Sequence, residues 1–200
     1  MIRDAHTHNL LSADGIISVG PDFTGFDPSR HYSVGIHPWL TAGENVVYLS
    51  AKLAETANRR EIIAIGETGI DRLRGGSPQI QESLFRQHIE LSERLSKPLI
   101  IHNVKGLDTI LQLNKEYNPR QPWIIHGFRG NGRVAAQLAS RGIYISLGER
   151  FNADVPSAIP PSLILAETDE SDMPIESIAA RIYPADPSLP FRNLGRLTGL

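Results

Sequence analysis

Eight short apolar segments recur along this chain of 200 residues, and several of them are apolar at nearly every position. Segments such as EIIAIGE, KPLIIH and GIYISLG show no alternation of apolar and polar residues. Continuous apolar segments of this length are typical of strands covered on both faces, which belong to parallel sheets. We therefore expect strands over residues 2–6, 15–19, 32–37, 62–67, 98–102, 122–126, 143–147 and 162–167.

Amphipathic helices are expected between several of these strands. The clearest covers residues 78–96, where Ser77 and Pro78 suit the N-cap and the first turn and apolar residues recur every three or four positions. Further helices are expected at residues 44–59, 106–117, 130–140 and 174–183. Helices alternating with eight strands predict an α/β fold, a TIM-type (β/α)8 barrel, as one domain over residues 1–200.

The early helices of this barrel are expected to be shortened or missing. Only the segments NLLSADG and PDFTGFDPSR separate the first three strands, and 200 residues is at the lower limit for the fold. Those strands then need another cover. The candidates are the loop PDFTGFDPSR, the tail over residues 184–200 and a second copy of the chain. The apolar residues of the tail make it the first choice and a second copy the next, so we expect a monomer or a weak homodimer.

The composition of the chain excludes some kinds of metal site and argues against some classes of protein. The chain has no cysteine, so any metal ion must be held by His, Asp or Glu. A net charge of −2 argues against a general nucleic-acid coat protein. The amino terminus has no basic segment followed by an apolar one, and no apolar segment approaches membrane length. This pattern is typical of a cytoplasmic protein with no membrane partner.

Histidines and carboxylates gather at the carboxyl ends of the expected strands. In a barrel these ends converge on one mouth, where the active sites of the fold lie. Each residue alone could cap a helix or bond to the backbone, but together they would be costly to desolvate without divalent cations to neutralise them. The pattern therefore predicts a metal site. The residues are His6, His8, His37, Glu67, His102, His126 and Asp169.

Six short motifs around these residues resemble the TatD-related hydrolase family, a branch of the metal-dependent amidohydrolase-like barrels. They are DAHTH, GIHPW, AIGETGID, KPLIIH, IIHGF and ETD. The resemblance implies a centre of two metal ions, with His6, His8 and Asp169 on the first. It implies His102 and His126 on the second ion and Glu67 bridging both. It also implies hydrolysis of phosphodiester bonds in DNA, on ends or single strands.

The expected chemistry follows from this ligand set. Four imidazoles favour zinc, with manganese or magnesium as alternatives. Two ions can lower the pKa of a shared water and stabilise charge on phosphorus oxygens. We expect Asp169 to take the proton of that water, Glu67 to take part as the bridging catalytic ligand, and His37 to contact phosphate or support a ligand.

A rim of basic residues follows the strand ends and favours a phosphorylated substrate, such as DNA. Any single arginine in a loop is most often simply solvated, so only the whole group of basic residues favours such a substrate. The residues are Arg72, Arg74, Lys105, Arg129, Arg133 and Arg150.

Three other functions stay open. The opening DAHTHNLLSADG is similar to the PHP phosphoesterases, but that family needs histidines late in the chain and the last one here is His126. Amidohydrolase-type cleavage of C–N or C–O bonds uses the same barrel. The loop GIDRLRGG and the residues Glu170 and Ser171 depart from the TatD pattern, so a metal-binding relic without turnover is the non-enzyme alternative.

Overall fold

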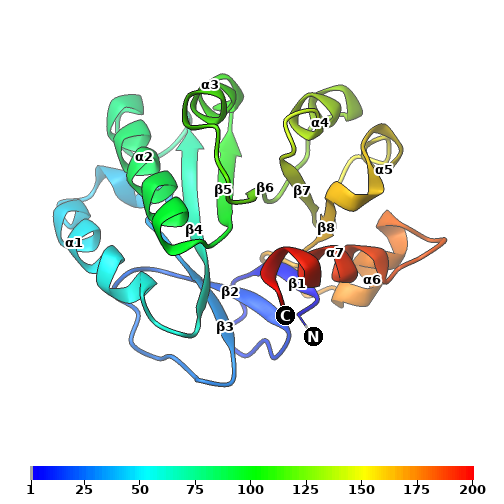
Figure 1. The fold of residues 1–200 in the computed structure, drawn as a ribbon, viewed down its shortest axis with the longest axis horizontal. Coiled ribbons are helices and arrows are strands. Elements are labelled where there is room, and N and C mark those ends of the chain that lie inside the picture. Colours follow the sequence, from blue (N-terminus) through cyan, green and yellow to red (C-terminus); the bar gives the residue numbers. More distant parts are fainter. Residues whose placement is uncertain (1) are drawn as a thin grey trace.

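A computed structural model describes residues 2–200, and in them eight parallel strands form one sheet in the order of the sequence (Figure 1). Each expected strand is present, although the bounds shift by a few residues. The strands are β1 (Asp4–Thr7), β2 (Gly15–Val19), β3 (His31–Val34), β4 (Ile62–Asp71), β5 (Leu99–Val104), β6 (Trp123–Ile125), β7 (Tyr144–Leu147) and β8 (Ile164–Ala166). The largest shift is in β4, which continues four residues beyond the expected end at Glu67.

The sheet curves into a nearly closed barrel, and its seam lies between β1 and β8. A parallel bridge joins Thr7 to Asp169 there. The Asp169 N–H donates to the His6 carbonyl (2.9 Å), and the His8 N–H donates to the Asp169 carbonyl (3.1 Å). The expected TIM-type barrel is thus confirmed, and it is closed by backbone bonds between residues of the expected metal site.

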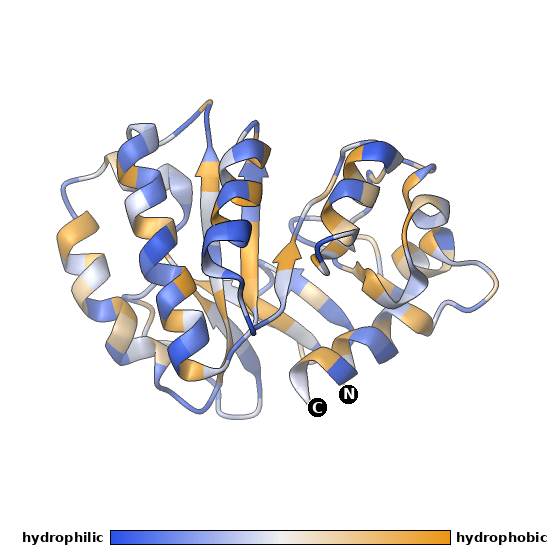
Figure 2. Cartoon of the chain, turned by 45° about the horizontal axis from the view of Figure 1, so that its top comes forward, coloured by the Kyte–Doolittle hydropathy of each residue, from blue (hydrophilic) through white to orange (hydrophobic). Residues whose placement is uncertain are grey.

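The strand residues alternate between two apolar clusters, as the period of a strand requires. One cluster lies inside the barrel near the amino ends of the strands and takes one buried residue from each of six strands: Ala5, Ile16, Ala64, Ile100, Ile124 and Leu165. The residues that follow the last five of these pack in the larger cluster between strands and helices: Ile17, Ile65, Ile101, Ile125 and Ala166. Figure 2 shows the resulting pattern, with mainly hydrophobic strands behind helices of mixed character.

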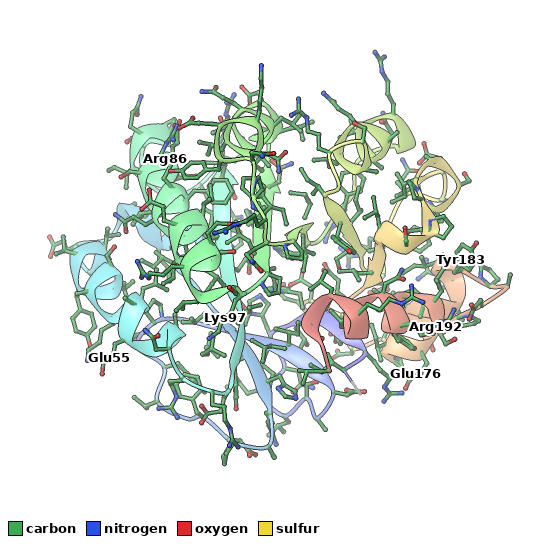
Figure 3. All side chains as sticks on the ribbon, viewed as in Figure 1. Glu55, Arg86, Lys97, Glu176, Tyr183 and Arg192 are labelled. Carbon is green, nitrogen blue, oxygen red and sulfur yellow. The ribbon has the colours of Figure 1, made fainter. Side chains whose placement is uncertain are left out.

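Helices cover the barrel from β3 onward. The main ones are α1 (Val46–Ala57), α2 (Pro78–Leu95), α3 (Leu107–Tyr117), α4 (Gly132–Ala139) and α6 (Ile175–Ile182), which confirm the five expected helices. The short elements η1 (Pro38–Ala42), α5 (Val155–Ala158) and η2 (Pro161–Leu163) lie between them. Arg86 of α2 ties this helix to α3 by pairing with Glu116 (3.0 Å), and it also pairs with Glu82 of its own helix (2.9 Å), on the upper side of the molecule in Figure 3.

The early helices are absent from residues 8–14 and 20–30, as expected. The loop between β2 and β3 supplies cover instead. Phe23 and Phe26 stack edge to face with centroids 5.0 Å apart, and Phe26 packs on Tyr32 of β3 at 5.1 Å. The Thr56 hydroxyl of α1 donates to the Pro21 carbonyl (2.7 Å) and holds this loop against the helix.

The tail, which is not among the expected helices, forms a further helix, α7 (Leu189–Thr198). Three prolines in the tail argue against a helix in the sequence. Pro190 is compatible with one, because it falls in the first turn, where a missing N–H costs nothing. Leu194 joins the cluster inside the barrel, and Asn193 donates to the Ile164 carbonyl of β8 (2.8 Å). The tail therefore closes the amino-terminal end of the barrel, while the loop before β3 covers that strand.

In the part of the chain that the structure describes, none of the helices combines the length and the apolar character needed to cross a membrane.

Candidate metal centre

The carboxyl ends of the strands surround a cavity of about 940 Å³. Six of the seven residues predicted for the site line it: His8, His37, Glu67, His102, His126 and Asp169. The seventh, His6, is fully buried and lies directly beside Glu67 and Asp169. The structure thus brings together all the histidines and carboxylates that the strand ends predicted.

Close backbone packing places Glu67 at the middle of this group. Gly66 has a φ of 131°, and a Cβ atom there would lie 2.4 Å from the Ile100 carbonyl of β5. A Cβ atom on Gly35 would lie 2.5 Å from the Glu67 carbonyl. Only glycine fits both positions, so β4 can approach its neighbours closely at the residue that carries the carboxylate.

The two oxygens of Glu67 face different histidines. Oε2 lies 3.4 Å from His6 Nε2 and 3.5 Å from His8 Nε2. Oε1 lies 2.7 Å from His126 Nε2 and 2.8 Å from His102 Nδ1. One carboxylate therefore separates the nitrogen donors into two sets, one for each of its oxygens.

Asp169 completes the first set. Its Oδ1 lies 3.8 Å from His6 Nε2 and 3.6 Å from His8 Nε2. Its φ of 55° is in the left-handed region, which Asp tolerates better than most residues, and its backbone bonds to β1 hold it there. Its side chain is 29 % exposed, whereas that of Glu67 is 4 % exposed. Asp169 is the acidic group of the two that solvent reaches.

His37 is a hydrogen-bond donor in this arrangement. Its Nδ1 accepts the Trp39 N–H (3.1 Å), so the proton of the neutral ring is on Nε2. That Nε2 lies 3.0 Å from Glu67 Oε1. The proton on Nε2 therefore faces the Glu67 carboxylate, at the wall of the cavity.

Burial and mutual attraction shift the pKa values of these groups. Burial alone would raise the pKa of Glu67, but His126, His102 and His37 outweigh it and hold that pKa well below its usual range. Burial opposes protonation of His126, yet Glu67 and Glu167 raise its pKa well above the usual value. Burial lowers the pKa of His6, which favours the neutral ring that a metal ion requires.

The donor set fits divalent cations. Among residues 2–200, both ring nitrogens of His6 are buried without a hydrogen-bond partner. Unpaired buried nitrogens are costly, and a cation would use the lone pair of this ring. The donor atoms gather within 4.8 Å of one another in three groups: His6, His8, Glu67; His6, His126, Asp169; and His37, Glu67, His102.

The family model described as TatD-related DNase matches residues 24–192. This chain belongs to that family. An uncharacterized metal-dependent hydrolase of Buchnera aphidicola subsp. Baizongia pistaciae is 33% identical over 147 residues, which are 68% of this chain and 54% of that protein. The Deoxyribonuclease Tat-D of Schizosaccharomyces pombe is 27% identical over 155 residues, 68% of this chain and 50% of that protein. This TatD-family chain therefore spans about half the length of the curated relatives it matches.

A solved structure confirms the fold of this TatD-family chain. The crystal structure of YjjV, a TatD homologue from Escherichia coli, superposes with a TM-score of 0.80 at 20% identity. The comparison covers 100% of this chain and 98% of that one. The expected family and the expected barrel are both confirmed.

Three carboxylates beside the TatD-family site were not predicted from the sequence. Glu167 Oε1 lies 3.6 Å from His126 Nδ1, and Asp71 Oδ2 lies 3.4 Å from His102 Nε2. Asp4 accepts from the hydroxyl of Thr168 (2.6 Å) and has its pKa raised to about 7 by burial. Because histidines that bind metal usually present their second nitrogen to a carboxylate, the motifs could have been searched for such partners.

The basic residues divide into those that reach the cavity and those that do not. Arg74, Lys105 and Arg129 line it. Arg72 instead pairs with Asp108, its Nη2 lying 2.8 Å from that carboxylate. Arg150 lines a smaller adjoining cavity of about 330 Å³, and Arg133 lines neither.

Proposed function

We propose that this chain hydrolyses phosphodiester bonds with two divalent metal ions at the barrel mouth. The observation that carries the proposal is the division of donors between the two oxygens of Glu67. His6, His8 and Asp169 would hold one ion, and His102 and His126 the other. Glu67 would bridge them. Nitrogen and carboxylate donors together suit zinc or manganese better than magnesium, which prefers oxygen alone.

When bound, such ions lower the pKa of a water molecule and stabilise charge on the phosphoryl oxygens. The proton of that water needs an acceptor within reach. Asp169 is the candidate, because its carboxylate faces the cavity and is partly exposed, while Glu67 is buried among five histidines within 3.5 Å. Asp169 would hold this proton on a carboxylate oxygen until the leaving group departs.

The phosphate would meet donors already in place. His37, whose Nε2–H faces Glu67, would donate to the phosphate once a cation held that carboxylate, and Lys105 and Arg129 add positive charge from the loops after β5 and β6. Lys105 has a φ of 55°, so its backbone turns sharply directly after β5. Positive groups arranged around one anion stabilise the charge that develops on it during the reaction. DNA is the proposed substrate, as the family model and the name of the fission yeast relative support.

A hydrolysis screen tests the function. The metal-free chain would be loaded in turn with zinc, manganese and magnesium and given bis-p-nitrophenyl phosphate, single-stranded DNA and an amino-acid p-nitroanilide. We expect the two phosphodiesters to be cleaved and the amide to be left intact. His102→Ala is the control, and it should be inactive with every substrate.

Two outcomes would contradict the proposal. Cleavage of the amide with both phosphodiesters untouched would indicate an amidohydrolase. Metal binding without turnover of any substrate would indicate a binding protein that has lost its chemistry.

A further inference from the structure

The wall of the cavity beside His37 is aromatic and apolar, unlike the basic side. Trp39 and Leu40 of η1 and Leu73 of the loop after β4 line the cavity. They are exposed by 47, 47 and 64 % respectively. Large apolar side chains that line an active-site cavity and stay open to solvent mark a place for an apolar part of a ligand.

Trp39 is held in a fixed orientation. Its Nε1–H donates to Asp71 Oδ2 (2.6 Å). The guanidinium of Arg74 lies over the indole, 4.5 Å from the ring centroid. The ring of His37 meets the indole nearly edge-on, with centroids 4.7 Å apart and an interplanar angle of 77°. These contacts fix a flat surface directly beside the residues of the candidate metal centre.

We propose that Trp39 and Arg74 form a stacking site for one nucleobase of the substrate. This inference rests on the proposed function, since it places the base next to the phosphate that is cleaved. Indole rings and guanidinium planes are the two protein surfaces on which unpaired bases stack. A nucleobase can use both groups, since its π face stacks on an indole ring and on a guanidinium plane.

The stacking site has a consequence for specificity. Every base has a π face, so the site would accept any of the four, and it would require an unpaired base rather than a continuous duplex. Within the DNA ends or single strands that the family resemblance implies, the stacking site would add sequence tolerance at the stacked position.

Two substitutions of Trp39 separate stacking from the hydrogen bond to Asp71. Trp39→Phe and Trp39→Leu both remove the Nε1–H donor, but only Trp39→Leu removes the aromatic face. Each would be assayed on a single-stranded oligonucleotide and on the same oligonucleotide with abasic nucleotides. Tyr48→Leu is the control, because Tyr48 is 53 % exposed and does not line the cavity.

We expect wild type, Trp39→Phe and Tyr48→Leu to cleave the normal strand about tenfold faster than the abasic strand, in kcat/KM. Trp39→Leu should cleave both at nearly the same rate. Equal ratios in Trp39→Leu and Trp39→Phe would overturn the stacking site. If the wild type cleaves no DNA at all, the proposed function is wrong instead. The stacking site is then tested by nucleotide binding alone.

Intrinsic fluorescence supplies that binding measurement. The chain has two tryptophans, and Trp123 is buried at 2 % exposure, so an added nucleotide can reach only Trp39. Deoxyadenosine monophosphate should quench the emission of wild type, and deoxyribose 5-phosphate should not. Trp39→Phe should show no quenching. Equal quenching by both compounds, or none up to millimolar nucleotide, would reject stacking on Trp39.

Discussion

Glu167 and His126 face each other beneath the barrel mouth, with Glu167 Oε1 3.6 Å from His126 Nδ1. Both side chains are buried, and the Gly127 N–H donates to the same carboxylate oxygen. The opposite nitrogen of His126 points at Glu67. Glu167 thus orients the imidazole and favours a proton on Nδ1, which leaves Nε2 free for a metal ion.

Replacing this carboxylate should weaken the metal centre. Glu167→Gln keeps the size of the side chain but removes the charge that favours Nδ1–H. We expect metal affinity to fall by about 10- to 100-fold, measured by competition with a chromogenic chelator. Glu170→Gln, a more exposed carboxylate that lines the same cavity, is the matched control and should bind normally. Unchanged affinity in Glu167→Gln would contradict the orienting role.

Asp169→Asn should reduce kcat far more than it changes KM. Asn keeps the size of the side chain and also tolerates the left-handed backbone, so the fold should be retained. The amide cannot accept a proton from water at neutral pH. Steady-state kinetics on bis-p-nitrophenyl phosphate give the comparison. A variant with normal kcat and a raised KM would move the proton acceptor to another residue.

The buried His88 should make stability depend on pH. Its Nε2 accepts the Ile36 N–H (2.9 Å) and its Nδ1–H donates to the Leu84 carbonyl (2.7 Å). Burial lowers its pKa to about 4, below the ordinary 6.5. The unfolded chain therefore binds a proton that the folded chain does not between these pH values. Stability should fall as pH drops from 6.5 to 4, by about 3 kcal/mol from this residue.

Urea unfolding at several pH values measures this effect. His88→Gln is the comparison, because its amide oxygen can still accept from Ile36 but does not titrate. The free energy of unfolding of the variant should decline less steeply than that of wild type between pH 6.5 and 4. If the free energy of unfolding declined equally in the two proteins, burial would not lower the pKa of His88 as stated.

The tail helix should contribute directly to stability. Leu194 of α7 is 1 % exposed and packs inside the barrel end, whereas Leu200 is 53 % exposed. Leu194→Ala should cost about 2 to 5 kcal/mol in thermal or urea unfolding, and Leu200→Ala, the matched control, should cost almost nothing. Similar stability of the two variants would mean that α7 is not needed to close the barrel.

Much of the barrel was predictable because its strands are buried on both faces and read as continuous apolar segments. The site histidines followed from the same segments, since each stands at a strand end and the ends converge. Helix α7 was not predictable, because Pro190 normally argues against a helix. It is tolerated here only because it lies in the first turn of α7.

The supporting carboxylates were missed for a different reason. Asp71 lies on β4 only because the strand continues past Glu67, and no local pattern indicates that extension. Glu167 meets His126 from another strand, and such pairing depends on the register between strands. Arg72 was expected on the basic rim of the mouth but pairs with Asp108 instead. This ion pair could not be predicted, because Asp108 comes from a helix that follows the next strand.

Metal content is the most direct test of the bridging carboxylate on which the account depends. Elemental analysis would be made on wild type, Glu67→Gln, His102→Ala and the control Glu170→Gln, after loading with zinc and gel filtration. We predict two ions per chain in wild type and the control, the partial loss of one in His102→Ala, and depletion of both sites in Glu67→Gln. Two ions retained at full occupancy in Glu67→Gln would contradict the account.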